Sequence, residues 1–209
     1  MSGRRVGVII LAAGESRRMG EPKQLLRFGG ETLLRRAVSA ALGSRCRPVV
    51  VVLGAHADEL RGEVAGTHVA VNEEWAEGMS SSIRCGLRAL ETATSGPADA
   101  AILMLCDQPF VTSGLINRLL EAYEETRPPL VASRYEARGE STFGVPALFS
   151  RELFCELMEL RGAEGAKRFI RQHSSEALVV AAPEAAFDVD TPEDYRVLRH
   201  GAADGTVLY

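Results

Sequence analysis

Short apolar runs alternate with amphipathic segments along the first 126 residues of the chain. The apolar runs are rich in β-branched residues, which predicts strands, and the segments between them repeat apolar residues at the spacing of a helix. Strands are predicted over residues 6–13, 48–54, 67–72 and 100–106, and helices over residues 32–42, 57–64, 80–93 and 113–126. Continuous apolar strands that alternate with helices are typical of a mainly parallel sheet covered on both faces, so the pattern predicts an α/β fold.

The order of elements changes after residue 130. Strands are predicted over residues 130–137, 144–150 and 177–183, and helices over residues 151–160, 164–172 and 191–198. No repeat, low-complexity segment or linker interrupts the pattern, so the 209 residues predict a single domain. Ligands of open α/β sheets bind at the carboxyl ends of the strands, and the loops there are where a site is expected.

Composition and charge exclude several classes of protein. Apolar residues make up 46% of the chain and charged residues 25%, as in an ordinary globular protein. A net charge of −4 argues against a nucleic-acid partner. No apolar run approaches the roughly 20 residues that a membrane helix needs, so no membrane partner is expected. The four cysteines and four histidines are scattered, which fits neither a disulfide framework nor a zinc site and predicts a cytoplasmic protein with reduced thiols.

The N-terminus has a basic start and an apolar stretch, as a signal peptide does. Because that stretch runs directly into a charged loop without a convincing cleavage site, it is interpreted as the first strand. The loop that follows matches neither standard phosphate-binding motif. Gly14 is followed by Glu15 and Ser16, which breaks the dinucleotide fingerprint, and Gly20 is followed by Glu21 where a Walker loop needs lysine.

The same loop nevertheless carries residues that suit a phosphate. Gly14 allows backbone N–H groups to approach an anion closely. Arg18 offers a planar fork of donors and Lys23 a compact charge. A solvated basic loop is the competing interpretation of this segment taken alone.

A serine-rich segment lies before the helix predicted over residues 80–93. Ser80, Ser81 and Ser82 follow Gly78, and one of them is expected to cap this helix, which leaves the others available for a ligand. Trp75, a few residues earlier, is expected either to stack on a ligand or to pack in the core.

Three aspartates follow predicted strands. Asp107 emerges from an apolar strand, where a carboxylate suits a hard cation such as magnesium or, alternatively, caps a turn. Asp188 and Asp190 alternate on a segment predicted to be extended, so we expect only one of them to face the same cleft as Asp107. Thr191 or Asp190 is expected to cap the last helix, with Pro192 in its first turn.

Together these loops predict nucleotidyl transfer. A nucleoside triphosphate carries about four negative charges, of which a bound magnesium ion offsets about two. Arg18 and Lys23 are available to offset the rest, while Asp107 and one of the later aspartates hold the metal. An acceptor then attacks the α-phosphate, and pyrophosphate leaves.

The motifs "LAAGESRRMGEPKQLL", "LCDQPFVT" and "DVDTPEDY" resemble the MobA-like nucleotidyltransferase family, and most closely its molybdenum cofactor cytidylyltransferase branch. Their order and spacing cover nearly the whole chain. The resemblance implies a Rossmann-like three-layer sandwich with a mainly parallel mixed sheet, like that of nucleotide-diphospho-sugar transferases. It also implies one nucleotidyltransferase domain over residues 1–209, with a nucleotide half over about 1–112 and an acceptor half over about 113–209.

The resemblance assigns residues to roles by position. Arg18, Lys23 and Asp107 are implied to be catalytic, and Asp107 and Asp190 to hold Mg²⁺. The implied nucleotide-binding residues are Leu11, Ala12, Ala13, Gly14, Arg18, Lys23, Gly54, Gly78, Ser80, Ser81 and Ser82. The implied acceptor-binding residues are Gly144, Pro146, Gly162 and Gly165. The guanine-specific branch resembles "LAGG" at the first motif, and the methyl group of Ala13 is expected to crowd a purine, which favours CTP.

The implied reaction transfers CMP from CTP to the terminal phosphate of molybdopterin cofactor, and the product implies a molybdoenzyme partner. The acceptor motifs depart from the family pattern: Val145 replaces a histidine, Ala163 an aspartate and Lys167 an arginine. GTP, or another acceptor such as a sugar phosphate or other phosphomonoester, therefore remains an alternative. A further alternative is a non-enzymatic chaperone that delivers the cofactor, which the retained Arg18 and Lys23 argue against.

Overall fold

The computed structural model describes residues 5–137 and 139–203 of the chain. The strands are β1 Val6–Leu11, β2 Arg27–Phe28, β3 Glu31–Thr32, β4 Val49–Leu53, β5 His68–Val71, β6 Ala100–Leu105, β7 Leu130–Ala137, β8 Glu140–Ser150 and β9 Ala177–Ala181. The α-helices are α1 Leu33–Gly43, α2 Ala57–Leu60, α3 Met79–Ala93, α4 Ser113–Thr126, α5 Phe154–Glu159, α6 Ala166–Gln172 and α7 Pro192–Ala203. Short 3₁₀ helices are η1 Lys23–Leu25, η2 Arg61–Glu63, η3 Trp75–Glu77, η4 Arg151–Leu153 and η5 Pro183–Ala185.

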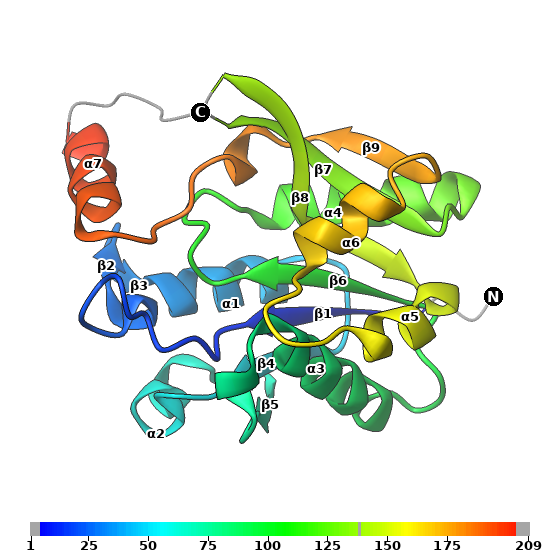
Figure 1. Ribbon diagram of the computed structural model, residues 1–209, viewed down its shortest axis with the longest axis horizontal. Coiled ribbons are helices and arrows are strands. Elements are labelled where there is room, and N and C mark those ends of the chain that lie inside the picture. The colour runs from blue at the N-terminus through cyan, green and yellow to red at the C-terminus, as the bar shows by residue number, and fades with distance from the viewer. Residues whose placement is uncertain (1–4, 138, 204–209) are drawn as a thin grey trace.

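A seven-stranded sheet in the order β5-β4-β1-β6-β8-β7-β9 forms the centre of the fold (Figure 1). The strands β5, β4, β1 and β6 are parallel to one another, β8 runs antiparallel to both β6 and β7, and β9 is parallel to β7. The prediction of a mainly parallel mixed sheet is confirmed. Antiparallel strands can be joined by a short hairpin, whereas parallel strands need a long crossover. The antiparallel strand β8 can therefore follow β7 closely in the sequence.

Helices cover both faces of the sheet and make three layers. Along β1, Val8 and Ile10 are buried in one core cluster with residues of α1 and α4. Ile9 and Leu11 belong to a second cluster with residues of α3, α5 and α6. Successive side chains of a strand point to opposite faces, so an uninterrupted apolar strand fills both cores. Burying one such side chain contributes about 1.5–3 kcal/mol.

Side-chain caps fix where several helices begin. Thr32 accepts a hydrogen bond from Arg35 N at the start of α1, and Thr112 accepts one from Leu115 N at the start of α4. At α7 the hydroxyl of Thr191 accepts from Asp194 N at 3.2 Å, which confirms the predicted cap. Such caps satisfy backbone donors that the first turn of a helix leaves unpaired.

The carboxyl ends of β1 and β6 lie side by side, with Leu11 paired to Leu105. The segment before α7 is drawn to the same edge, because Val189 N donates to Asp107 O at 3.0 Å and the Val189 side chain is fully buried. Loops far apart in the sequence therefore meet there (Figure 1). Every helix within residues 5–137 and 139–203 is too short or too polar to cross a membrane.

Candidate active site

A cavity of about 480 Å³ opens at this edge, and we call it the edge cavity. Its walls come from the loop after β1, the turn from η3 into α3, the end of β6 and the segment before α7. The residues assigned from the sequence that line it are Leu11, Ala12, Ala13, Gly14, Arg18, Lys23, Gly78, Ser82, Asp107 and Asp190. The structure thus brings most of the expected nucleotide and metal residues into one space.

Gln24 holds the loop after β1 in shape. Its buried side-chain amide donates to Ala12 O at 3.0 Å and to Gly14 O at 2.8 Å. The Ser16 hydroxyl donates to Gln24 Oε1 and accepts from Lys23 N, so the two ends of the loop are tied together. The sequence interpretation missed both Gln24 and Ser16. The sequence did contain a signal for Gln24, because it is an amide directly before the apolar pair Leu25 and Leu26. The segment was interpreted only for its charged residues.

Two glycines near this loop have different surroundings. A Cβ atom placed on Gly14 would have no described atom within 4 Å, so the backbone there is open to a ligand. A Cβ atom on Gly54 would lie 2.7 Å from Ala13 O and 2.8 Å from Trp75 Cβ. Gly54 therefore packs behind the loop and supports it, and it does not line the edge cavity.

Charged side chains gather at one end of the edge cavity. Lys23 Nζ binds Asp107 Oδ2 and, at 2.8 Å, Asp190 Oδ1. Arg18 binds the other carboxylate oxygen of Asp190 at 3.0 Å. Burial opposes the charge of Lys23, but the attraction of Asp107 and hydrogen bonds to Asp107 and Asp190 outweigh it and raise the pKa of Lys23. Burial likewise opposes the charge of Asp190, while Lys23 and Arg18 lower its pKa overall.

The expectation that only one of Asp188 and Asp190 faces the cavity is wrong, because both line it. Residues two apart in an extended segment point to the same side, and only the residue between them points the other way. Asp188 and Asp190 accordingly both face the cavity, while the side chain of Val189 is fully buried and Val189 N donates to Asp107 O. Asp188 keeps exposed surface at the mouth of the cavity. Desolvation by the surrounding wall, and then the like charges of Asp107 and Asp190, raise the pKa of Asp188 to about 7.

The serines before α3 have mostly internal partners. Gly78 is the N-cap residue of α3, so the expectation that a serine caps this helix is wrong. Asn72 Nδ2 donates to the hydroxyls of Ser81 and Ser82 at 2.8 and 3.1 Å. Of the three serines, Ser82 alone lines the edge cavity, whereas Ser80 and Ser81 are hydrogen-bonded inside the protein.

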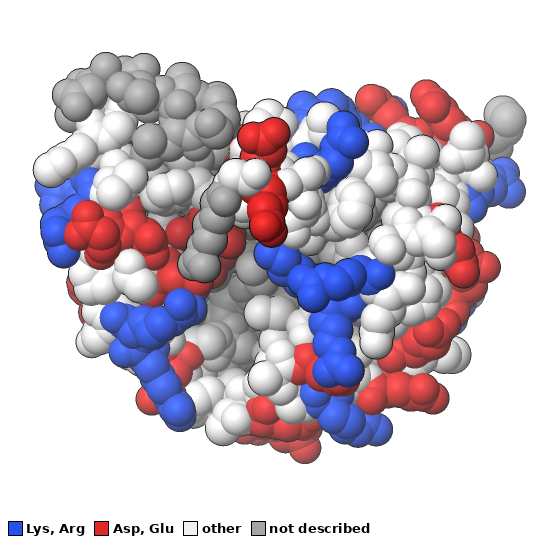
Figure 2. All heavy atoms as spheres, turned by 45° about the horizontal axis from the view of Figure 1, so that its top comes forward, with Lys and Arg blue, Asp and Glu red and all other residues white. Residues whose placement is uncertain are grey.

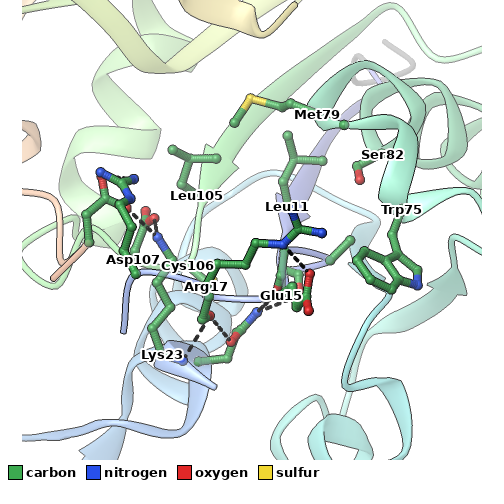
Figure 3. Close-up of a pocket in the computed structure, with 18 of the residues that line it drawn as sticks. Leu11, Glu15, Arg17, Lys23, Trp75, Met79, Ser82, Leu105, Cys106 and Asp107 are labelled. Atoms are coloured by element: carbon green, nitrogen blue, oxygen red, sulfur yellow. Dashed lines mark hydrogen bonds and ion pairs between the residues drawn. The ribbon is translucent and has the colours of Figure 1, made fainter. Parts of the chain in front are cut away.

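The side of the edge cavity near Trp75 is more apolar, although the ion pair of Glu15 and Arg17 lies next to it (Figure 3). Figure 3 shows Trp75, Met79 and Ser82 on the wall that faces away from Lys23 and Asp107. Trp75 is half-buried and packs against the core while also lining the cavity, so both roles expected for it are compatible. The cavity thus has one end dominated by Lys23, Asp107 and Asp190 and a more apolar side beside Trp75 and Met79, which suits a ligand with a phosphate chain and a ring.

A second cavity, of about 850 Å³, lies beside the β7–β8 hairpin, and we call it the hairpin groove. It shares Arg18, Asp188 and Asp190 with the edge cavity, so the two spaces are adjacent and these side chains lie between them. Lys167 and Arg171, one helical turn apart on α6, also line it. This charged face of the molecule is hollowed (Figure 2).

The residues assigned to the acceptor do not line either cavity: they are Gly144, Pro146, Gly162 and Gly165. Gly144 and Pro146 lie in the buried part of β8, where a Cβ atom on Gly144 would strike the ring of Tyr135. Gly165 is the N-cap residue of α6 and packs against Met79.

Comparison with known proteins gives consistent matches over nearly the whole chain. The sequence model of a family described as MobA-like NTP transferase domain matches residues 8–177. The nicotine blue oxidoreductase of Paenarthrobacter nicotinovorans is 31% identical over 198 residues, which cover 91% of this chain and 95% of that protein. The purine catabolism protein PucB of Bacillus subtilis (strain 168) is 31% identical over 203 residues, which cover 91% of this chain and 94% of that protein.

Solved structures agree with the sequence matches. Rv0371c of Mycobacterium tuberculosis H37Rv, solved in complex with manganese, is 28% identical and superposes with a TM-score of 0.71 over 93% of this chain and 97% of that one. The three-layer architecture is the nucleotide-diphospho-sugar transferase fold, which nucleotidyltransferases of known structure share.

Proposed function

The chain belongs to the MobA-like NTP transferase family, and on that premise we propose that it transfers CMP from CTP to the terminal phosphate of molybdopterin cofactor, with release of pyrophosphate. The reaction takes place in the cytoplasm, and the product passes to a molybdoenzyme. The observation that carries the proposal is the group of Arg18, Lys23, Asp107 and Asp190 beside the open backbone of Gly14. Two cations and two carboxylates at one end of the cavity suit a phosphate chain and its metal.

The donor set fits a hard divalent cation. Asp107 Oδ1 is buried and has no hydrogen-bond partner in the described part of the chain, although buried polar atoms are rarely left unpaired. Magnesium usually takes one or two carboxylates and completes its shell with substrate phosphates and water. Asp107 and Asp190 therefore suffice, even though residues 5–137 and 139–203 contain no group of three potential ligands from His, Cys, Asp and Glu. The metal supplies Lewis-acid stabilisation of developing charge.

The relative solved with manganese supports the use of a divalent metal. Magnesium remains our choice among divalent metals, because carboxylate and phosphate oxygens are hard ligands and histidine and cysteine are not among the residues proposed to bind it.

Arg18 and Lys23 are proposed to bind the phosphates of the nucleotide. A phosphomonoester acceptor has a second pKa of about 6 and is mostly a dianion at pH 7, so it needs no general base. The described lining of the edge cavity accordingly includes no histidine. The protein has only to align two phosphates that repel each other and to stabilise the charge that builds up between them.

The more apolar side of the edge cavity, beside Trp75 and Met79, is proposed to hold the base. Ala13 lines the same cavity, and its methyl group is proposed to reduce the room for a purine, which favours CTP. One methyl group is worth about 1–3 kcal/mol of discrimination, so GTP is the alternative nucleotide.

The acceptor is proposed to lie in the hairpin groove, which shares Asp188 and Asp190 with the edge cavity. Lys167 and Arg171 on α6 are available to its anionic groups. Because Lys167 stands where the family has arginine and Val145 where it has histidine, a sugar phosphate or another phosphomonoester remains the second candidate acceptor.

One relative has the name of an oxidoreductase. The loop after β1 lacks the dinucleotide fingerprint, since Glu15 and Ser16 follow Gly14. The charged end of the cavity instead pairs cations with carboxylates that fit a metal–triphosphate complex. Group transfer is therefore favoured over a redox reaction, and a chaperone would have no need of these groups.

Pyrophosphate release with molybdopterin cofactor as acceptor, measured with each of the four nucleoside triphosphates, tests the proposal. Release with CTP that depends on both magnesium and the acceptor is the expected result. A thermal-shift series with each nucleotide, with and without magnesium, complements it, because a ligand that binds the folded state raises the melting temperature. Stabilisation by no triphosphate would overturn the enzyme assignment and favour the chaperone.

A further inference from the structure

Arg84 on α3 connects the two halves of the site. Its side chain is 8% exposed, and one guanidinium nitrogen donates to Glu77 Oε2 at 2.6 Å. Another donates to Leu160 O at 2.6 Å, in the loop that precedes α6. A buried arginine that bridges a carboxylate and a carbonyl forms charge-assisted hydrogen bonds, which are about twice as strong as neutral ones.

Glu77 extends this connection with its second oxygen. Oε1 accepts from Gly162 N at 3.2 Å and from the Ser80 hydroxyl at 3.2 Å. The same hydroxyl lies 2.7 Å from Gly162 O. We call the group formed by Glu77, Ser80, Arg84, Leu160 and Gly162 the Glu77–Arg84 latch. It explains why Ser80 points away from the edge cavity.

The two segments also touch directly, backbone to backbone. Gly78 has a φ of +125°, and a Cβ atom there would lie 2.5 Å from Gly162 O. A Cβ atom on Gly165 would lie 2.6 Å from Met79 Sδ. At Gly78 the Gly162 backbone leaves no room for a side chain, and at Gly165 the Met79 side chain would have to move. The hydrogen bonds of the latch therefore join two segments that are already in close contact.

Each side of the latch carries residues of a different cavity. On the α3 side, Gly78, Met79 and Ser82 line the edge cavity. On the other side, the loop through Gly162 leads directly into α6, which presents Lys167 and Arg171 to the hairpin groove. A ligand bound at the start of α3 would therefore contact one side of the latch, while α6 lies on the other side.

We propose that Glu77 and Arg84 are positioning residues that fix α6 relative to the edge cavity, so that nucleotide binding is transmitted to the acceptor groove. This inference rests on the proposed function for the identity of the two ligands. The coupling runs through a continuous set of hydrogen bonds between packed elements, which is the physical connection that coupling between two sites requires.

The latch stays intact over the pH range in which such an enzyme works. The hydrogen bond from Arg84, and then that from the Gly162 amide, lower the pKa of Glu77 to about 2. The carboxylate is therefore ionised at any pH near neutrality, and a change in coupling between pH 6 and 8 would have to come from other groups.

Hydrogen–deuterium exchange of residues 160–172, measured with and without CTP and magnesium, tests the transmission without any acceptor. In the wild-type chain we expect nucleotide to slow exchange in this segment at least about fivefold, the lower end of ordinary coupling between sites. In Glu77→Ala we expect nucleotide affinity to stay within about twofold while the added protection disappears. Glu77 is one-third exposed, so this variant is suited to fold even if Arg84→Ala does not.

A matched control comes from Arg151, which also bridges a glutamate, Glu91, and a carbonyl, Ala98 O. Arg151→Ala removes the same kind of contact far from both cavities and is expected to leave the nucleotide-dependent protection of residues 160–172 unchanged. Arg84→Lys, which keeps the charge and one hydrogen bond, is expected to restore part of the protection lost in Arg84→Ala. A general loss of stability would not follow this pattern.

Kinetics give a second measurement. Loss of the latch is expected to raise the KM of the acceptor about tenfold or more, with a smaller change in the KM of CTP. Nucleotide-dependent protection that survives in Glu77→Ala, or that is absent from a wild-type chain which binds CTP, would overturn the inference alone. A wild-type chain that binds no nucleoside triphosphate would overturn the proposed function, and the inference with it.

Discussion

Lys23 Nζ lies 2.8 Å from Asp190 Oδ1, although 167 positions of sequence separate the two residues. The same ammonium group binds Asp107, so one cation joins the loop after β1, the end of β6 and the segment before α7. Removing one member of a largely desolvated charge group leaves the others uncompensated. Substitutions at this point are therefore expected to lower stability as well as activity, although the folded state should persist because Lys23, Asp107 and Asp190 belong to neither of the two large apolar clusters.

Lys23→Ala is expected to abolish turnover while leaving the fold intact. Loss of a positioned donor to developing charge typically costs about 10²–10³ in kcat. Pyrophosphate release measures the loss, and circular dichroism checks the fold. Arg196→Ala serves as the control, since Arg196 is exposed, pairs with Glu193 and lines neither cavity, and exposed pairs are worth about 0–1 kcal/mol. Near-normal release by Lys23→Ala with its true acceptor would remove Lys23 from the mechanism.

Asp107→Ala is also expected to abolish turnover, and Asp190→Ala to cost more activity than Asp188→Ala. Asp190 is held by both Lys23 and Arg18, whereas Asp188 has neither as a hydrogen-bonded partner in the described contacts. Magnesium titrations of the two variants give the measurement, with the magnesium concentration for half-maximal activity shifted more by Asp190→Ala. The reverse order would exchange their roles.

Lys23→Gln is expected to bind free Mn²⁺ more tightly than the wild-type chain, even though it is inactive. Lys23 and Arg18 hold both oxygens of Asp190 and one of Asp107, so a free cation competes with them for these oxygens. A gain of about tenfold corresponds to only about 1.4 kcal/mol. Electron paramagnetic resonance of Mn²⁺ with and without CTP measures it. Equal affinities of the two proteins for free Mn²⁺ would show that Lys23 does not compete with the metal.

Ala13→Gly is expected to shift nucleotide preference toward GTP. The methyl group removed lines the edge cavity, and the expected change in the ratio of kcat/KM values is about tenfold or more. Ala12→Gly is the matched control, because Ala12 is equally buried and lies next to it in the loop. A ratio that changes as much in Ala12→Gly would indicate a distorted loop instead of a wider base site.

The charge of Glu77 is expected to contribute to stability above its ordinary pKa of 4.5 and to lose that contribution as the pH falls toward about 2. A carboxyl group whose pKa is lowered by folding stabilises the folded state fully above its unfolded pKa. This contribution decreases as the pH falls and is lost below the folded pKa. Urea midpoints of the wild-type chain and Glu77→Gln should therefore differ most at pH 7 and converge as the pH falls from about 4.5 to about 2. A difference that is constant over this range would show that the charge of Glu77 is not what stabilises the latch.

The sequence predicts the central sheet well, because strands such as Val49–Leu53 are apolar on both faces and cannot be mistaken for surface helices. It does not predict the small β2–β3 hairpin, whose two-residue strands carry no periodic signal. The helix predicted over 57–64 divides into α2 and η2 because local apolar spacing does not distinguish an α-helical turn from a 3₁₀ turn.

The site divides in a similar way. Gly14, Arg18, Lys23 and Asp107 could be identified as chemically competent from the sequence, and the structure brings them together. The shared orientation of Asp188 and Asp190 was also predictable, because residues two apart in an extended segment point to the same side, and the expectation of opposite sides misapplied that rule. The latch could not be predicted from the sequence. Its contacts join residues 76 and 85 positions apart, and no local pattern encodes such pairs.

Gln24 fixes the loop after β1 through hydrogen bonds to Ala12 O and Gly14 O. This fixed conformation affects the rate at which a nucleotide binds. A segment fixed in this way has already lost its conformational entropy when the protein folds, and an incoming nucleotide bears no cost for ordering it. Such a loop cannot serve as a lid. The arrival of the nucleotide is then governed by diffusion and by the charges at the cavity mouth, and any closing motion has to come from the opposite wall.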